Sequence, residues 1–142
     1  MLMELLNQKI QLIESVGDWK DAIRISAKPL LDNDSIEERY IDAMISMCEQ
    51  LDAYIVLADL FAMPHASPGS GAKKMDVALT IVKESVDFIG KPVNVILTLA
   101  AVDSNSHLAL LQEVAETMGD GEKISRLIGA KNSDEILQIL VE

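Results

Sequence analysis

The sequence predicts a single α/β domain, a sandwich in which helices cover both faces of a central mixed β-sheet. Three observations support this prediction. Apolar runs typical of strands occur at the start of residues 54–69, at 77–82 and at 93–101. Amphipathic segments with helical spacing lie between these runs, and alternation of the two kinds favours a layered α/β fold. The run 93–101 is apolar nearly throughout, as in a central strand covered on both faces.

Length and composition indicate one globular domain spanning residues 1–142, long enough to bury a real core. No apolar run reaches the roughly 18 residues that a membrane span needs. The N-terminus lacks the basic region and small-residue cleavage site of a secretory signal. Cys48 is the only cysteine, which excludes an internal disulfide and a cysteine-rich metal site. We therefore expect a cytoplasmic protein.

The net charge of −11 argues against nucleic-acid backbones and anionic membrane surfaces as partners. An acidic surface suits docking onto a basic protein surface, although it equally serves plain solubility. The apolar N-terminal segment, residues 2–16, predicts a short turn or helix followed by a brief strand. This segment either packs on the core of its own chain or contributes to a homodimer.

Two helices are expected before the first long apolar run. Asp18 is a candidate N-cap for the first, which continues to about Leu30. The sequence Ser35-Ile36-Glu37-Glu38 matches a capping box and predicts a second helix over residues 36–51. Cys48 falls on the apolar stripe of that helix, so we expect it in the core.

The second half of the chain predicts strands and then three helices. A strand over 77–82, a charged turn and a short apolar segment at 86–88 precede the strand at 93–101. A loop with capping residues then leads to a helix over 107–118. After a glycine-containing break, a short helix ends at Gly129 and a final helix is capped at 133–135.

Residues 54–69 form the stretch that most constrains its own backbone, and it contains His65. Pro64 fixes its own φ near −65° and biases the residue before it toward extended geometry. Pro68, Gly69 and Gly71 prevent a helix from including the segment. The pattern thus places an imidazole on a constrained loop at the end of a buried strand.

Two histidines, His65 and His107, are the candidate site residues, and each follows an apolar strand. If those two strands are neighbours in the sheet, the imidazoles converge on one pocket. The alternatives are a surface loop residue for His65 and a helix N-terminal residue, hydrogen-bonded to the loop, for His107. Two histidines without a cysteine or carboxylate cluster make a poor zinc site. The sequence also contains no Walker A loop, GxGxxG or GxSxG, so we expect no metal, no nucleotide cofactor and no serine nucleophile.

Residues 55–66, Ile-Val-Leu-Ala-Asp-Leu-Phe-Ala-Met-Pro-His-Ala, closely resemble the active-site signature of the mannitol/fructose-type (type 2) enzyme IIA domains of the phosphoenolpyruvate-dependent sugar phosphotransferase system. The resemblance covers nearly the whole chain. It includes Lys91–Ala101, and the segment His107–Leu111 resembles the second histidine motif of the family.

The resemblance implies that His65 accepts a phosphoryl group from the phosphohistidine of HPr and passes it to a cysteine of a IIB component, which serves a membrane IIC protein. It places His107 beside His65 as the second active-site histidine, and we expect it to donate a hydrogen bond to the phosphoryl oxygens. The protein would then be a phosphotransferase. Neutral imidazole is a suitable nucleophile for this relay near physiological pH.

The chain departs from the mannitol-type pattern sixteen residues before His65. There the family carries an Arg-Glu pair whose arginine helps to hold the phosphoryl group, whereas this chain reads Met47-Cys48-Glu49-Gln50, with no arginine. The following segment, residues 52–58, resembles the ascorbate-type and related branch instead. Two other interpretations are a regulatory module of the same fold, whose phosphorylation state controls a partner protein, and a small-molecule binding domain without covalent chemistry.

Overall fold

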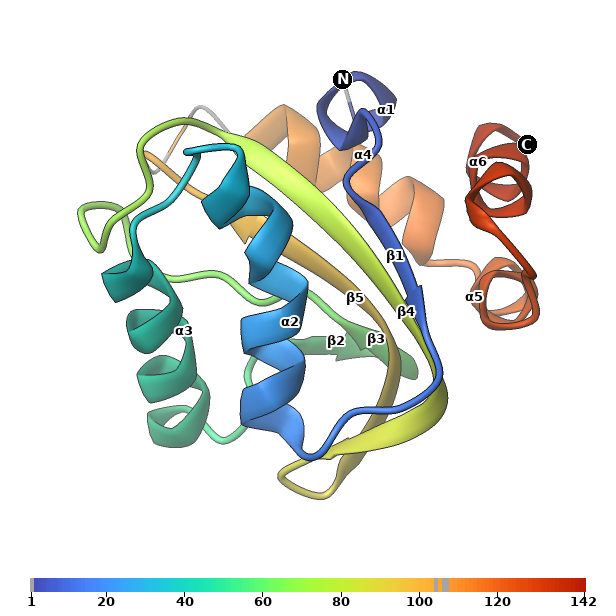
Figure 1. Cartoon of the computed structure of the whole chain (residues 1–142), viewed down its shortest axis with the longest axis horizontal. Coiled ribbons are helices and arrows are strands. Elements are labelled where there is room, and N and C mark those ends of the chain that lie inside the picture. Colours follow the sequence, from blue (N-terminus) through green and yellow to red (C-terminus); the bar gives the residue numbers. More distant parts are fainter. Residues whose placement is uncertain (1, 104, 106–107) are drawn as a thin grey trace.

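The computed structural model describes residues 2–103, 105 and 108–142, and it shows a five-stranded mixed sheet between two layers of helices (Figure 1). The strand order is β1-β4-β5-β3-β2. The strands are β1 Ile10–Ile13, β2 Val56–Ala58, β3 Leu60–Ala62, β4 Asp76–Phe88 and β5 Lys91–Ala100. The helices are α1 Leu2–Leu6, α2 Trp19–Asp32, α3 Glu38–Gln50, α4 Leu108–Met118, α5 Gly121–Ile128 and α6 Ser133–Val141.

The sheet is mixed, as the sequence predicts. β1 pairs parallel with β4, and β3 pairs parallel with β5. β4 and β5 form an antiparallel hairpin in the centre. The two residues between them, Ile89 and Gly90, have φ of 52° and 93°. Positive φ at both positions matches the twist of a two-residue hairpin, which explains the tight connection.

Helices cover both faces of the sheet, as expected. α2 and α3 pack on one face and α1, α4, α5 and α6 lie on the other (Figure 1). Side chains of β5 alternate between these two layers: Val95 and Leu97 join the core beneath α4 and α5, whereas Ile96 joins the core beneath α2 and α3. Because side chains alternate along a strand, burial on both faces requires the nearly continuous apolar run that the sequence shows.

The predicted capping box at Ser35 is wrong. The N-cap of α3 is Glu37, without a side-chain capping bond, and the Ser35 hydroxyl instead donates to Asp76 Oδ2 at 2.5 Å. Both Ser35 and Asp76 are buried, so the hydroxyl serves a tertiary contact rather than a helix end. At the other helices, Asp18 caps α2 as predicted, and Asn132 rather than Ser133 caps α6.

The charged turn predicted after residue 82 is also wrong, because β4 continues to Phe88. The polar residues 83–85 lie where the register between β4 and β5 is irregular, between Ile81 and Val86. Lys83 Nζ donates to the carbonyl oxygen of Ile128, at 2.6 Å, and to that of Ala130. The ammonium group of Lys83 is thus hydrogen-bonded to carbonyl oxygens at the end of α5, and β4 can include this charged residue without interruption.

The N-terminal segment packs on the core of its own chain. Leu2 and Leu6 of α1 are 1% and 0% exposed, and both belong to the core that contains α4 and α5. Of the two expectations for this segment, the structure therefore supports intramolecular packing, whereas homodimerisation stays a prediction. Cys48 is buried, as predicted. Within the part of the chain that the structure describes, no helix is long and apolar enough to cross a membrane.

Candidate active site

His65 lies just beyond the end of β3, at the same edge of the sheet as the end of β5. The two strands are parallel neighbours, with Ala62 opposite Ile96. The condition set in the sequence analysis for convergence of the two histidines, that the strands preceding them are neighbours, is therefore met. The single strand expected at the start of residues 54–69 is corrected: β2 and β3 are short antiparallel strands separated by Asp59, and Leu60, the first residue of β3, has φ of 66°.

Backbone hydrogen bonds fasten the segment before His65. The N–H of Met63 donates to the carbonyl oxygen of Ile55 at 2.8 Å, and the N–H of Leu99 donates to the carbonyl oxygen of Pro64 at 2.9 Å. Met63 and Pro64 are both buried, whereas His65 is partly exposed. The loop thus presents its imidazole from a fixed backbone, as the proline pattern predicts.

The imidazole of His65 is held by its own loop. Its Nδ1 lies 2.7 Å from the carbonyl oxygen of Met63. A carbonyl oxygen only accepts, so Nδ1 carries the proton in this contact, and the lone pair of the neutral ring is on Nε2. This arrangement selects Nε2 as the nucleophilic atom of the ring.

The two tyrosines of the chain meet at the backbone next to His65. The hydroxyl of Tyr54 donates to the carbonyl oxygen of His65, and its ring packs edge-on against the imidazole with centroids 5.1 Å apart. The hydroxyl of Tyr40, on α3, accepts from the N–H of Ala66 at 3.1 Å and from that of Ala101 at 3.1 Å. It donates in turn to the carbonyl oxygen of Leu99 at 2.8 Å.

Both hydroxyls are protonated near neutral pH and can donate, and burial extends this protonated state to higher pH. It raises the pKa of Tyr54 to about 12 and also raises the pKa of Tyr40 above its usual value near 10. Sequence reasoning missed these two residues as parts of the site. Tyr40 lies on the apolar stripe of its helix, and neither tyrosine carries a local signal of its contact, because the partners are 26 and 11 residues away in the chain.

The loop after His65 turns back toward the start of α3. Gly71 has φ of 129°, and its carbonyl oxygen accepts from the N–H of Glu37 at 2.9 Å. Arg39 donates to the carbonyl oxygen of Gly69 at 3.1 Å. Arg39 is thus the arginine that contacts this loop, whereas Arg24 pairs with Asp21 and Arg126 with Glu142.

The predicted partner of His65, His107, lies outside the described residues. The described chain shows only where the approach to it begins, at Ala101, whose N–H is bound by Tyr40 at the end of β5. Convergence of the two imidazoles therefore stays a prediction.

The environment of the single cysteine does not favour a nucleophilic thiolate, and the described residues do not form a metal site. Burial and Glu49 raise the pKa of Cys48 to about 11, so the thiol is protonated near neutral pH. Across residues 2–103, 105 and 108–142, no group of three His, Cys, Asp or Glu side chains is arranged to hold a metal ion.

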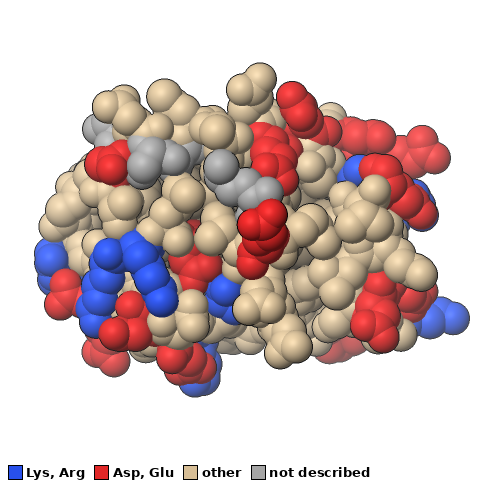
Figure 2. All heavy atoms as spheres, turned by 90° about the horizontal axis from the view of Figure 1, so that it is seen from above, with Lys and Arg blue, Asp and Glu red and all other residues tan. Residues whose placement is uncertain are grey.

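The surface near this end of the molecule carries both signs of charge. Figure 2 shows basic side chains gathered at the left of the face, with acidic side chains beside them, and mostly acidic charges on the right. Lys73 and Lys74 are exposed on the segment that follows the His65 loop, and Lys73 pairs with Asp34 at 2.5 Å.

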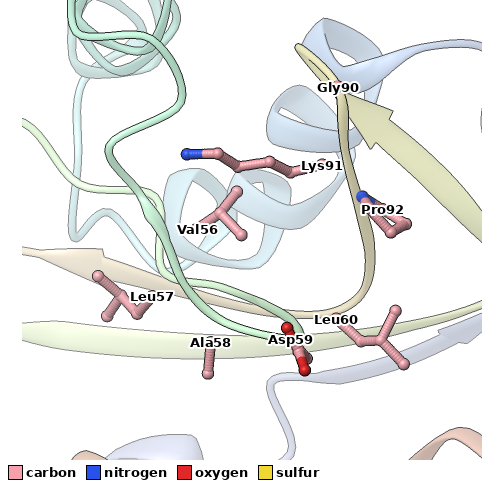
Figure 3. Close-up of a pocket in the computed structure, with 8 residues that line it drawn as sticks. All are labelled: Val56, Leu57, Ala58, Asp59, Leu60, Gly90, Lys91 and Pro92. Carbon is pink, nitrogen blue, oxygen red and sulfur yellow. The ribbon is translucent and has the colours of Figure 1, made fainter.

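A hollow of about 610 Å³ lies at the opposite end of the strands from His65 (Figure 3). The turn between β2 and β3, which includes Asp59, forms one side, and Lys91 and Pro92 at the start of β5 form another. Since His65 follows the far end of β3, this hollow does not belong to its site.

Comparison with known families gives a match over nearly the whole chain. The model for the phosphoenolpyruvate-dependent sugar phosphotransferase system, EIIA 2, matches residues 4–142. The chain belongs to this EIIA type 2 family. The recognition made from residues 55–66 and from the segment around residue 107 is thereby confirmed, as is the α/β fold.

Relatives of this EIIA domain include proteins named for two different substrates, ascorbate and mannitol. The chain is 33% identical over 138 residues to the ascorbate-specific PTS system EIIA component of Shigella boydii, covering 94% of this chain and 90% of the relative. The solution structure of the mannitol-specific cryptic phosphotransferase enzyme IIA of Escherichia coli has a TM-score of 0.90 at 32% identity, covering 98% and 97%. The structure of a complex of enzyme IIA-Mtl and phosphorylated enzyme IIB-Mtl from Escherichia coli shares the fold, with a TM-score of 0.81 at 20% identity, covering 95% of each chain.

Proposed function

We propose that this EIIA protein is a cytoplasmic phosphocarrier in which His65 accepts a phosphoryl group from phospho-HPr. His65 then passes the group to a cysteine of a cognate IIB component during sugar uptake through a membrane IIC protein. The observation that carries the proposal is the contact between His65 Nδ1 and the Met63 carbonyl oxygen. This contact directs the lone pair of the ring to Nε2 on a partly exposed side chain.

Nε2 of His65 serves in both steps, acceptance of the phosphoryl group from HPr and its transfer to IIB, and in each step one bond to phosphorus forms while another breaks. In the first, the lone pair of Nε2 forms a bond to phosphorus while the N–P bond of the donor phosphohistidine breaks, and its electrons return to the donor ring. Positive charge develops on the His65 ring, and the Met63 carbonyl oxygen stabilises it through the Nδ1 proton. In the second, a cysteine thiolate attacks phosphorus and the Nε2–P bond breaks. Such transfers depend mainly on positioning and charge stabilisation.

Partner and sugar follow from the family and from the names of relatives. We take IIB as the acceptor because of family membership, and ascorbate or a related compound as the transported substrate because of the ascorbate-specific relative. We assign His107 the role of holding phosphoryl oxygens on the basis of the second histidine motif alone. The acidic net charge supports protein partners rather than nucleic acid.

The acceptor assignment is tested by labelling with radioactive phospho-HPr. The variant His65→Ala should take up no label, whereas the control Ser67→Ala, two residues further along the same loop, should label like the wild type. The adduct should be acid-labile and stable to base. Undiminished labelling of the His65→Ala variant, or an acid-stable adduct, would refute the assignment.

The second histidine is tested separately. The variant His107→Ala should fold normally and still accept the label, but more slowly, because it removes stabilisation rather than the acceptor. Transfer at the wild-type rate would contradict this role. Onward transfer is measured by mixing labelled protein with candidate IIB proteins of ascorbate and mannitol systems.

A further inference from the structure

Both tyrosine hydroxyls of the chain bind the same peptide unit, the one that joins His65 to Ala66. Tyr54 donates to its carbonyl oxygen, and Tyr40 accepts from its N–H at 3.1 Å. The chain contains only two tyrosines, and they come from different segments, one on α3 and one on the loop before β2. A peptide unit bound at both polar ends cannot rotate about its flanking bonds without losing at least one of these bonds.

We propose that Tyr40 and Tyr54 are positioning residues for phosphoryl transfer, which fix the 65–66 peptide and through it the direction from which Nε2 of His65 meets phosphorus. This inference rests on the proposed function of His65. The plane of that peptide sets ψ of His65, and the Met63 contact sets the ring. Together they leave the imidazole little freedom, and an in-line attack needs a fixed direction.

Tyr40 extends this control to the end of β5. Its hydroxyl is fully buried and also binds the carbonyl oxygen of Leu99 and the N–H of Ala101. One oxygen atom thereby ties the backbone at the two candidate histidine loops to each other. Ala66 and Ala101 are 2% and 3% exposed, so loss of the hydroxyl would leave two buried N–H groups without their acceptor. Tyr54 is partly exposed and binds one group, so its loss should have the smaller effect.

The arrangement also determines which backbone donors remain for the phosphoryl group. The N–H of Ala66, the first after His65, points to Tyr40 and is used there. It is therefore a structural donor, not a ligand for the phosphoryl oxygens. The two tyrosines act on the reaction only through the backbone of His65.

The test is single-turnover transfer from phospho-HPr to the full chain, measured over a range of donor concentrations. The variants are Tyr40→Phe, Tyr54→Phe and the double variant, each of which removes only hydroxyl oxygens. Thr98→Val is the matched control, because Thr98 is buried on β5 and its hydroxyl has no hydrogen-bond partner in the described part of the chain.

We expect the maximal rate of Tyr40→Phe to fall about tenfold, with the half-saturating donor concentration unchanged, since an ångström-scale misplacement of a reacting group costs up to ~10²-fold. Tyr54→Phe should fall less. The double variant should be slower than either but less than the product of the two effects, because both act on one peptide unit. Thr98→Val should transfer at the wild-type rate.

A second readout does not depend on activity. In Tyr40→Phe, exchange of the Ala66 amide proton with solvent should accelerate, and the ¹⁵N resonances of the His65 ring should shift. This measurement applies also if the Tyr40→Phe variant is less stable, provided that it remains folded. Unchanged maximal rates in both single variants, or a Thr98→Val loss equal to that of Tyr40→Phe, would overturn the proposal.

Failure of the positioning role of the two tyrosines can be distinguished from failure of the phosphocarrier function. If wild-type protein takes no label on His65, the phosphocarrier assignment fails and the rates have no meaning. If the wild type is labelled on His65 and both tyrosine variants match it, the assignment holds and the positioning role is wrong.

Discussion

Replacing Gly71 by alanine should destabilise the protein through contact with the residue that fastens the His65 loop. Gly71 has φ of 129°, a region that L-residues rarely adopt. A Cβ added there would lie 3.1 Å from both the backbone nitrogen and the Cβ of Tyr40, and 3.0 Å from Cγ of Arg39. The arginine side chain can move, but the start of α3 cannot do so without disturbing the Tyr40 hydroxyl.

The magnitude has two parts. Backbone strain of a non-glycine residue at such a φ costs about 1–3 kcal/mol. Overpacking against a fixed neighbour adds about 1–3 kcal/mol. Gly90→Ala separates them, because Gly90 has φ of 93° and a Cβ there meets nothing within 4 Å. We therefore expect Gly71→Ala to lose about 1–3 kcal/mol more than Gly90→Ala.

The assay is urea unfolding followed by fluorescence of Trp19, the only tryptophan, whose ring lies 6.2 Å from that of Phe88. Gly71→Ala should also slow transfer from phospho-HPr, whereas Gly90→Ala, at the opposite end of the sheet, should not. If the two variants lose equal stability, the close approach of Gly71 to Tyr40 does not constrain the fold and the reasoning is refuted.

Two further predictions concern buried polar groups. Folding raises the pKa of Tyr54 from 10 to about 12 and the pKa of Cys48 from 9 to about 11. As the pH rises, the unfolded chain therefore loses these two protons before the folded protein does. The free energy of unfolding should be constant from neutral pH to about 9 and should fall between about pH 9 and 12. Denaturant titrations under reducing conditions should show this fall, smaller in Cys48→Ala, and a flat profile would contradict it. Asp76→Ala should cost about 3–5 kcal/mol, because it leaves Lys9, 3.2 Å away and 14% exposed, without its buried partner. Asp34→Asn removes the charge of the exposed pair with Lys73 and keeps a side chain suited to the φ of 58° at this position, so it should cost under about 1 kcal/mol in the same assay; equal losses would contradict the role of burial.

The layered fold was predictable because the pattern of apolar residues shows which faces of each strand and helix are buried, and those buried faces determine the fold class. The nearly continuous apolar run at 93–101 required two covered faces, and β5 is buried on both. The position of His65 was predictable because Pro64 and the following glycines restrict the backbone locally. Adjacency of β3 and β5, on which convergence of the two loops depends, was stated only as a condition, since pairing of strands is a long-range property.

The parts that were not predictable depend on tertiary partners. Ser35 matches a capping box, but the buried carboxylate of Asp76, 41 residues away, binds its hydroxyl. The polar residues after 82 resemble a turn, but the end of α5 accepts from Lys83 and the strand continues. Tyr40 resembles any core residue on a helical stripe. In each case a side chain satisfies a distant group, and local spacing does not encode that choice.

The identity of the phosphorylated nitrogen tests the account most directly. Full-length protein labelled with ¹⁵N in its histidine rings is phosphorylated by phospho-HPr, and the ³¹P–¹⁵N coupling identifies the bonded atom. The contact between Nδ1 and the Met63 carbonyl oxygen predicts that phosphorus is bonded to Nε2 of His65. Phosphorus bonded to Nδ1 of His65, or to a nitrogen of His107, would contradict it.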